Sequence, residues 1–177
     1  MTSNLTNVRN EQMFDRAVYE ARRQRLKKMV KTGLIVLLGN RKVPRNYGNN
    51  PAPFRQDSTF LYYFGLYQPD LAAVIDVDSD HTTLFATRSE MRDLWWKEPR
   101  LEADTALALT GVEKVRSWEE FETVVKGNRE KGNCIHYLPP YNDHGSQVLS
   151  RTLGLERTRV LSGASKVLMR SVVAQRL

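Results

Sequence analysis

The 177-residue chain is poor in the residues that build metal sites and disulfides. Cys134 is its only cysteine, so no internal disulfide is possible and a reducing, cytoplasmic location is expected. The three histidines, His81, His136 and His144, are not spaced to present two imidazoles to one metal ion. No apolar run approaches the roughly 20 residues that a membrane-spanning helix needs. We therefore expect no metal site and no membrane association within this sequence.

The composition is otherwise that of a folded domain. Hydrophobic residues make up 41% of the chain, and it contains three Trp, seven Tyr and six Phe. A chain of this length can bury a sizeable core as about one domain. We expect disorder only at residues 1–8, where the sequence is polar and lacks the apolar stretch of a secretory signal.

The net charge of +7 is concentrated near the start of the chain. Residues Arg9–Arg45 carry eleven Lys and Arg against three acidic residues, whereas the remainder carries sixteen basic and seventeen acidic residues. A nucleic-acid or anionic membrane surface has such a distribution. A solvated helix face followed by a basic loop has it too, and we favour this second interpretation.

Apolar spacing predicts a helix over residues 10–31 that is followed by a buried strand. The helix would bury one apolar side, and Arg25 would lie within it. This side consists of Phe14, Ala17, Val18, Ala21 and Met29. Gly33 ends this helix, and the unbroken apolar run Leu34–Leu38 predicts a strand that is covered on both faces. Such strands lie inside α/β sheets.

Three further strands are predicted at 71–77, 82–86 and 133–138. The short gap between the first two predicts a β-hairpin, so the sheet should be mixed. We expect Cys134 to be a buried structural residue of the last strand. The predicted fold is a single α/β domain in which helices flank a mixed β-sheet.

Helices are predicted over 89–96, 101–109 and 143–153, and another begins near Ser117. Ser117 and Glu120 match the spacing of a capping box, in which each side chain bonds a free amide at the helix start. The valine-containing tail 167–173 is β-prone. No self-sufficient catalytic constellation is present in the chain.

An aromatic block at residues 51–70 is the most distinctive stretch. It contains Phe54-Arg-Gln-Asp-Ser-Thr-Phe60 and then a tyrosine, a glycine and a Pro-Asp pair. The residues that define this signature are Arg55, Gln56, Asp57, Phe60, Tyr62, Gly65, Pro69 and Asp70. Three prolines and one glycine in the block interrupt regular structure, which predicts a loop, a short aromatic element and a turn. A charged trio before aromatic residues most simply pins loop carbonyls and pairs internally, because buried charges need partners.

This block resembles the N-terminal domain signature of the Xaa-Pro aminopeptidases (aminopeptidase P), relatives of prolidase and creatinase. Trp96-Lys-Glu-Pro-Arg-Leu101 resembles a second family segment, and Thr110-Gly-Val-Glu113 a third. The tail 168–177 is similar to the linker that leads into the catalytic domain of the family. The resemblance covers essentially the whole chain.

The resemblance implies that residues 1–177 form the creatinase/prolidase-type N-terminal domain of a metal-dependent Xaa-Pro aminopeptidase. Residues 166–177 would lead into a C-terminal pita-bread domain that binds two divalent metals, usually manganese. The chain itself would then have no catalytic residues, no cofactor and no activity alone. Its partners would be the catalytic domain, proline-containing peptides and further copies of the protein.

The same resemblance implies a substrate-pocket role for Trp96, because in bacterial relatives the matching Trp reaches the active site of a neighbouring subunit. Trp95 is an alternative, since the alignment can slip by one residue, and an ordinary core position remains open for either. Three other functions also remain open: a prolidase-like dipeptidase domain, a peptidase-like domain that binds proteins, and a nucleic-acid-binding domain.

Overall fold

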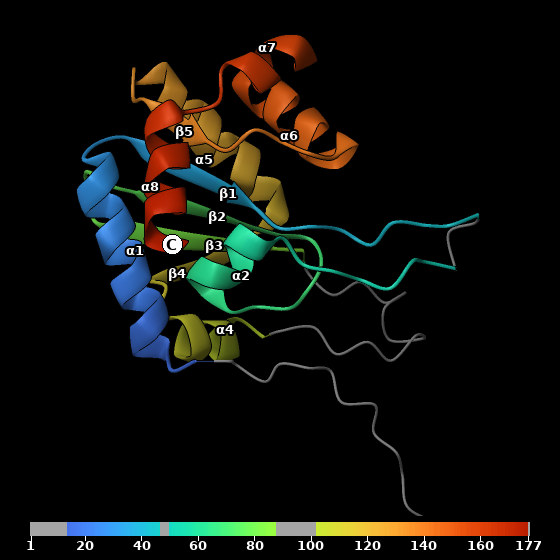
Figure 1. The fold of residues 1–177 in the computed structure, drawn as a ribbon, viewed down its shortest axis with the longest axis horizontal. Helices are drawn as coiled ribbons and strands as arrows, with labels where there is room; N and C mark the ends of the chain where they lie inside the picture. Colours follow the sequence, from blue (N-terminus) through green and yellow to red (C-terminus); the bar gives the residue numbers. More distant parts are fainter. Residues whose placement is uncertain (1–13, 47–49, 88–101, 177) are drawn as a thin grey trace, which may run out of the picture.

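The computed structural model describes residues 14–46, 50–87 and 102–176. In this part of the chain, five strands form one sheet in the order β4-β3-β2-β1-β5 (Figure 1). The strands are β1 (Leu34–Leu38), β2 (Leu71–Asp76), β3 (His81–Ala86), β4 (Lys114–Ser117) and β5 (Ile135–Tyr137). β2 pairs antiparallel with β1 and β3, whereas β1–β5 and β3–β4 are parallel. The predicted mixed sheet and the predicted hairpin are confirmed.

The central strand β1 has an apolar sequence throughout because it separates two cores. Ile35 and Leu37 point into one core, and Leu34 and Val36 point into the other. Successive side chains of a strand point to opposite faces, so a strand covered on both sides needs apolar residues at every position.

Helices cover both faces of the sheet (Figure 1). One face carries α1 (Arg16–Val30), α2 (Ser58–Phe64), α4 (Ala103–Thr110) and α8 (Lys166–Arg176). The other carries α5 (Trp118–Glu130), α6 (Asp143–Leu153) and α7 (Arg157–Ser162). None of the helices in the described residues is both long and apolar enough to cross a membrane.

The predicted buried side of α1 is wrong. Phe14 and Met29 are 43% and 39% exposed, and Arg25 is also exposed. The helix buries a different set, namely Tyr19, Arg23, Leu26, Lys27 and Val30. Apolar spacing missed this face because two of its five members are cations, whose charges are compensated by groups on other elements.

The tail and three local details also differ from the predictions. Residues 166–176 form helix α8 instead of a strand, and neither β4 nor α7 was predicted. Ser117 makes no side-chain cap on α5, and Glu120 instead lies 3.7 Å from Arg116. Cys134 is exposed and precedes β5. The predictions for residues 1–8 and 89–96 lie outside the described residues.

Candidate functional site

A crevice lies where the connections after two neighbouring strands diverge. β1 and β5 are parallel and adjacent, but the chain leaves β1 towards α2 on one face of the sheet and leaves β5 towards α6 on the other. In open α/β sheets, such a switch point leaves a crevice at the carboxyl ends of the strands, where ligands bind. A cavity of about 60 Å³ lies there, lined by residues 36–40, 137–142, Asp57, Gly145 and Leu149.

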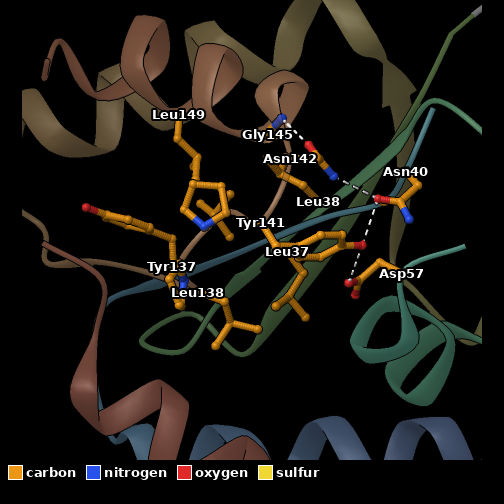
Figure 2. Close-up of a pocket in the computed structure, with 14 residues that line it drawn as sticks. Leu37, Leu38, Asn40, Asp57, Tyr137, Leu138, Tyr141, Asn142, Gly145 and Leu149 are labelled. Carbon is orange, nitrogen blue, oxygen red and sulfur yellow. Dashed lines mark hydrogen bonds between the residues drawn. The ribbon is translucent and has the colours of Figure 1, made fainter. Parts of the chain in front are cut away.

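A hydrogen-bond network from three separate segments closes one side of the crevice (Figure 2). The Tyr141 hydroxyl lies 2.9 Å from Asn40 Oδ1 and 3.1 Å from Asp57 Oδ2, and can donate to either. Asn142 Nδ2 donates to Asn40 Oδ1 at 3.2 Å. Burial, and then the Asp57 carboxylate, raise the pKa of Tyr141. The phenol is a protonated donor at neutral pH, and the residue as a whole is 69% exposed.

Gln56 of the signature fixes the loop that carries Asn40. Its buried side chain accepts hydrogen bonds at Oε1 from the backbone amides of Asn40, at 2.7 Å, and Asp57, at 2.9 Å. Its Nε2 donates to the carbonyl of Gln68 at 2.5 Å. Gln56 therefore joins both ends of the aromatic block to the loop after β1.

Asp57 and Arg55 differ in their surroundings, and they do not form the predicted internal pair. Asp57 is the N-cap of α2, because its Oδ1 accepts from the Phe60 amide at 2.8 Å while Oδ2 faces Tyr141. The Arg55 side chain is exposed, and its carbonyl accepts from Asn40 Nδ2 at 2.9 Å. The positive charge of Arg55 lies near enough to lower the pKa of Tyr141 slightly against the larger raising effects.

The other signature residues build α2 and its exit. Phe60 is fully buried in the core, and the Tyr62 hydroxyl donates to the carbonyl of Gln175 at 2.7 Å, which joins α2 to α8. Gly65 ends α2 in the left-handed conformation. Pro69 and Asp70 are half-buried in the turn before β2, and the Asp70 amide donates to the Asn40 carbonyl at 3.0 Å.

The two tryptophans predicted to reach a substrate pocket, Trp95 and Trp96, lie outside the described residues. Of the signature residues, the structure places Asp57 at the crevice, bonds Gln56 and Asp70 to the backbone of Asn40, and leaves Phe60 and Tyr62 in or beside the core. Sequence reasoning missed Asn40, Tyr141 and Asn142. Their signal was their position, because each lies just after an apolar run that ends at the same edge of the sheet.

A second polar group lies beside the crevice. His144, in the first turn of α6, stacks on Trp118 with ring centroids 6.3 Å apart, and its Nδ1 lies 3.5 Å from Nη1 of Arg41. Burial, and then the charge of Arg41, lower the pKa of His144, so the ring is uncharged at neutral pH and can accept a hydrogen bond from Arg41.

The described residues offer no ready metal centre. Nowhere among them do three or more His, Cys, Asp or Glu side chains gather so that they could hold an ion. His136 bonds instead to Ser165 Oγ at 2.8 Å and to the carbonyl of Thr32 at 3.0 Å. Because a carbonyl only accepts, Nε2 of His136 donates to Thr32, and the residue joins β5 to two loops.

Comparison with known proteins places most of the chain in a family. A model described as aminopeptidase P, N-terminal domain, matches residues 19–136, which is more than half of the chain. The chain belongs to this family of domains.

Curated relatives agree with the family. A protein of Aspergillus flavus named "Probable Xaa-Pro aminopeptidase" is 30% identical over 155 residues, which cover 82% of this chain and 30% of the relative. Human Xaa-Pro aminopeptidase 3 is 32% identical over 111 residues, which cover 58% of this chain and 21% of the relative. The chain thus spans about a third or less of the length of the relatives it matches.

Solved structures agree on the fold. Zinc-substituted aminopeptidase P of E. coli in complex with product superposes with a TM-score of 0.68 at 21% identity, over 80% of this chain and 33% of that one. The resemblance in sequence and the α/β fold with a mixed sheet are both confirmed.

Proposed function

We propose that this chain is the non-catalytic N-terminal domain of a metal-dependent Xaa-Pro aminopeptidase, an enzyme that removes a residue preceding proline. The match of the family model to residues 19–136 carries this proposal. In this proposal residues 1–177 form one domain, and α8 leads from residue 166 into a C-terminal pita-bread domain. The likeness to aminopeptidase P structures over a third of their length supports such a division.

The chemistry is assigned to the longer protein. We propose that two divalent metal ions, which we expect to be manganese, are held by the C-terminal domain. When occupied, such a site would polarise the substrate carbonyl and activate the attacking nucleophile. We assign no step of the reaction to the described residues.

The role of this domain would be to shape the substrate pocket and to support oligomer formation. We propose Trp96, or else Trp95, as the residue that reaches the active site of a neighbouring subunit, because an apolar, rigid ring suits contact with proline. The partners would be the catalytic domain, proline-containing peptides and further copies of the protein, in the cytoplasm.

A peptidase assay tests the proposal. An Xaa-Pro tripeptide with added Mn²⁺ is incubated with this chain and, separately, with the longer polypeptide that the proposal requires. We expect cleavage only by the longer form, and a reduced rate in its Trp96→Ala variant without loss of folding. Cleavage by the 177-residue chain alone would overturn the assignment of chemistry outside it.

Inactivity of both forms would count against the aminopeptidase function itself. A Trp96→Ala variant that unfolds as readily as a core mutant would instead assign this residue to the core. The Trp95→Ala variant is the matched comparison, because it tests the alternative register of the same segment.

A further inference from the structure

The crevice between β1 and β5 has an apolar interior and a polar rim. Leu37, Leu38 and Leu149 line it, while the side chains of Asn40 and Asp57 lie together at one end (Figure 2). Protein sites that take ligands combine an apolar lining with a few convergent polar groups. The crevice thus has the composition of a binding site.

The size of the cavity limits what can enter it. Its volume is about 60 Å³. A single water needs roughly 10–15 Å³ of such space, so the cavity holds about four to six groups of that size. One aliphatic side chain fits this space, whereas a nucleotide or a larger cofactor does not.

The rim can satisfy an uncharged peptide backbone. The Asn142 amide nitrogen carries two N–H groups, one of which is directed to Asn40, and the other can donate to a carbonyl. Asp57 Oδ2 and the Tyr141 hydroxyl can accept from a peptide N–H. Each residue of a peptide presents one such donor and one such acceptor.

The rim groups are held in place before any ligand arrives. The Asn40 backbone bonds to Gln56 at its amide and to Asp70 at its carbonyl, and Asn142 Oδ1 accepts from the Gly145 amide at 2.7 Å. Gly39 allows the loop after β1 to lie close to β2, because a Cβ at this position would lie 2.9 Å from the carbonyl oxygen of Leu71. Preorganised groups lose little entropy on binding, so even a small ligand can be retained.

We propose that this crevice binds a peptide segment through one aliphatic side chain. The side chain fills the space beside the Tyr141 ring, and the rim formed by Asp57, Tyr141 and Asn142 holds the neighbouring peptide bonds. The inference rests on the crevice alone and does not depend on the proposed peptidase function.

An amide NMR titration of the 177-residue chain tests it. The probe is N-acetyl-leucine N-methylamide, which offers one aliphatic side chain between two peptide bonds. We expect saturable shifts centred on Gly39, Asn40, Asn142 and Gly145, with a dissociation constant on the order of 1 mM for so small a ligand. N-acetylglycine N-methylamide should bind at least about tenfold more weakly, because it buries no side chain.

Two variants locate the binding. Gly145→Val should abolish it, because the Cβ position lies 3.3 Å from Pro140 Cβ and 3.9 Å from Leu38 Cδ1, at the cavity wall. Should that change unfold α6, Tyr141→Ala serves instead, since this side chain is 69% exposed and its loss should weaken binding about tenfold without loss of folding. Tyr67→Phe is the control, because it removes a hydroxyl that bonds to Phe54 and does not line the cavity.

Any of the following results would overturn the proposal. The first is no saturable shift up to the solubility limit of the leucine probe. The second is equal binding of the glycine probe, which would assign the interaction to the rim amides alone. The third is a set of shifts centred on α1 and α8 in place of the strand ends, or binding that persists unchanged in Tyr141→Ala.

Discussion

Arg23 lies on the buried face of α1, where its guanidinium bonds to the carbonyl ends of two other helices. It donates to the carbonyls of Tyr63 at 2.9 Å, Thr110 at 2.6 Å and Gly111 at 3.1 Å, which end α2 and α4. Helix C-termini carry partial negative charge and unsatisfied carbonyls, so one cation compensates both. Burial lowers the pKa of Arg23 to about 10, which leaves it charged at neutral pH.

Replacing Arg23 with Gln should therefore destabilise the fold strongly. The carbonyls at two helix ends would lose a charged donor within a buried site, and we expect a loss of about 3 kcal/mol in the free energy of unfolding. Arg25→Gln is the matched control on the same helix, because Arg25 is exposed, and it should change the value by less than about 0.5 kcal/mol. Urea unfolding of both variants checks this, and equal losses would contradict the assignment.

His144 should make stability depend on pH. Its pKa in the folded protein lies below the ordinary value of 6.5, through burial and then Arg41, with Arg151 adding to the effect and Asp70 opposing it. Below pH 6.5 the unfolded chain therefore binds more protons than the folded chain, so this contribution is complete above that pH and is lost as the pH falls below it.

The test compares unfolding free energies of the wild type and His144→Gln between about pH 5 and 7. We expect a smaller fall in stability for the variant over this range, and an intermediate fall for Arg41→Gln, since Arg41 supplies only part of the shift. Parallel curves for wild type and His144→Gln would remove this residue as the cause.

At the scale of elements, α8 shows how packing overrides local preference. Valines at 167, 172 and 173 favour a strand by propensity. In the structure, Leu168, Ser171 and Val172 fall on one helical face at spacings of three and four, and α8 packs on α1. The spacing was present in the sequence, but nothing local showed that α1 would be its partner.

Helix α2 depends on a close approach that only glycine permits. Gly65 ends the helix at φ +68°, and a Cβ there would lie 2.3 Å from the ring of Tyr19 on α1. The sequence of the aromatic block predicts a loop, a short aromatic element and a turn. It does not show that the glycine also makes room for α1. The contact is a property of two packed elements.

A pair of glycine substitutions separates backbone strain from this contact. Gly132 also has a positive φ, of +83°, but a Cβ there would meet nothing within 4 Å. Gly132→Ala should therefore cost roughly 1 kcal/mol from strain alone, and Gly65→Ala about 2 kcal/mol more from overpacking against Tyr19. Thermal and urea unfolding measure both, and equal costs would show that the ring moves aside without penalty.

For the molecule as a whole, the sequence predicted the architecture better than the site. The unbroken run Leu34–Leu38 and the short hairpin gap sufficed for a mixed α/β sheet, because periodicity and turn length are local properties. Gln56 and Asp57 were recognised by their motif. Tyr141 and Asn142 were not, since only the pairing of β1 with β5 brings them beside Asn40.

The basic region near the start of the chain is partly used inside the fold. Arg22 and Arg23 bond to carbonyls at the end of α2, and Lys27 lies 2.7 Å from the carboxylate of Asp80. Arg16 pairs with Glu20. Cations that are held by protein groups are poor partners for phosphates, so the local charge overstates the strength of a nucleic-acid surface.

We therefore predict weak, non-specific binding of DNA. In fluorescence anisotropy with a short duplex, association should be detectable at low salt and absent at about 150 mM salt, with a log–log salt slope below about 3 in magnitude. Lys28→Glu, on α1, together with Lys31→Glu, at the C-cap of this helix, should abolish the low-salt signal because both changes reverse charges that are open to solvent. Tight binding that persists at physiological salt and in the double variant would instead favour a nucleic-acid-binding function. Such binding would need contacts with the duplex other than those of the exposed charges.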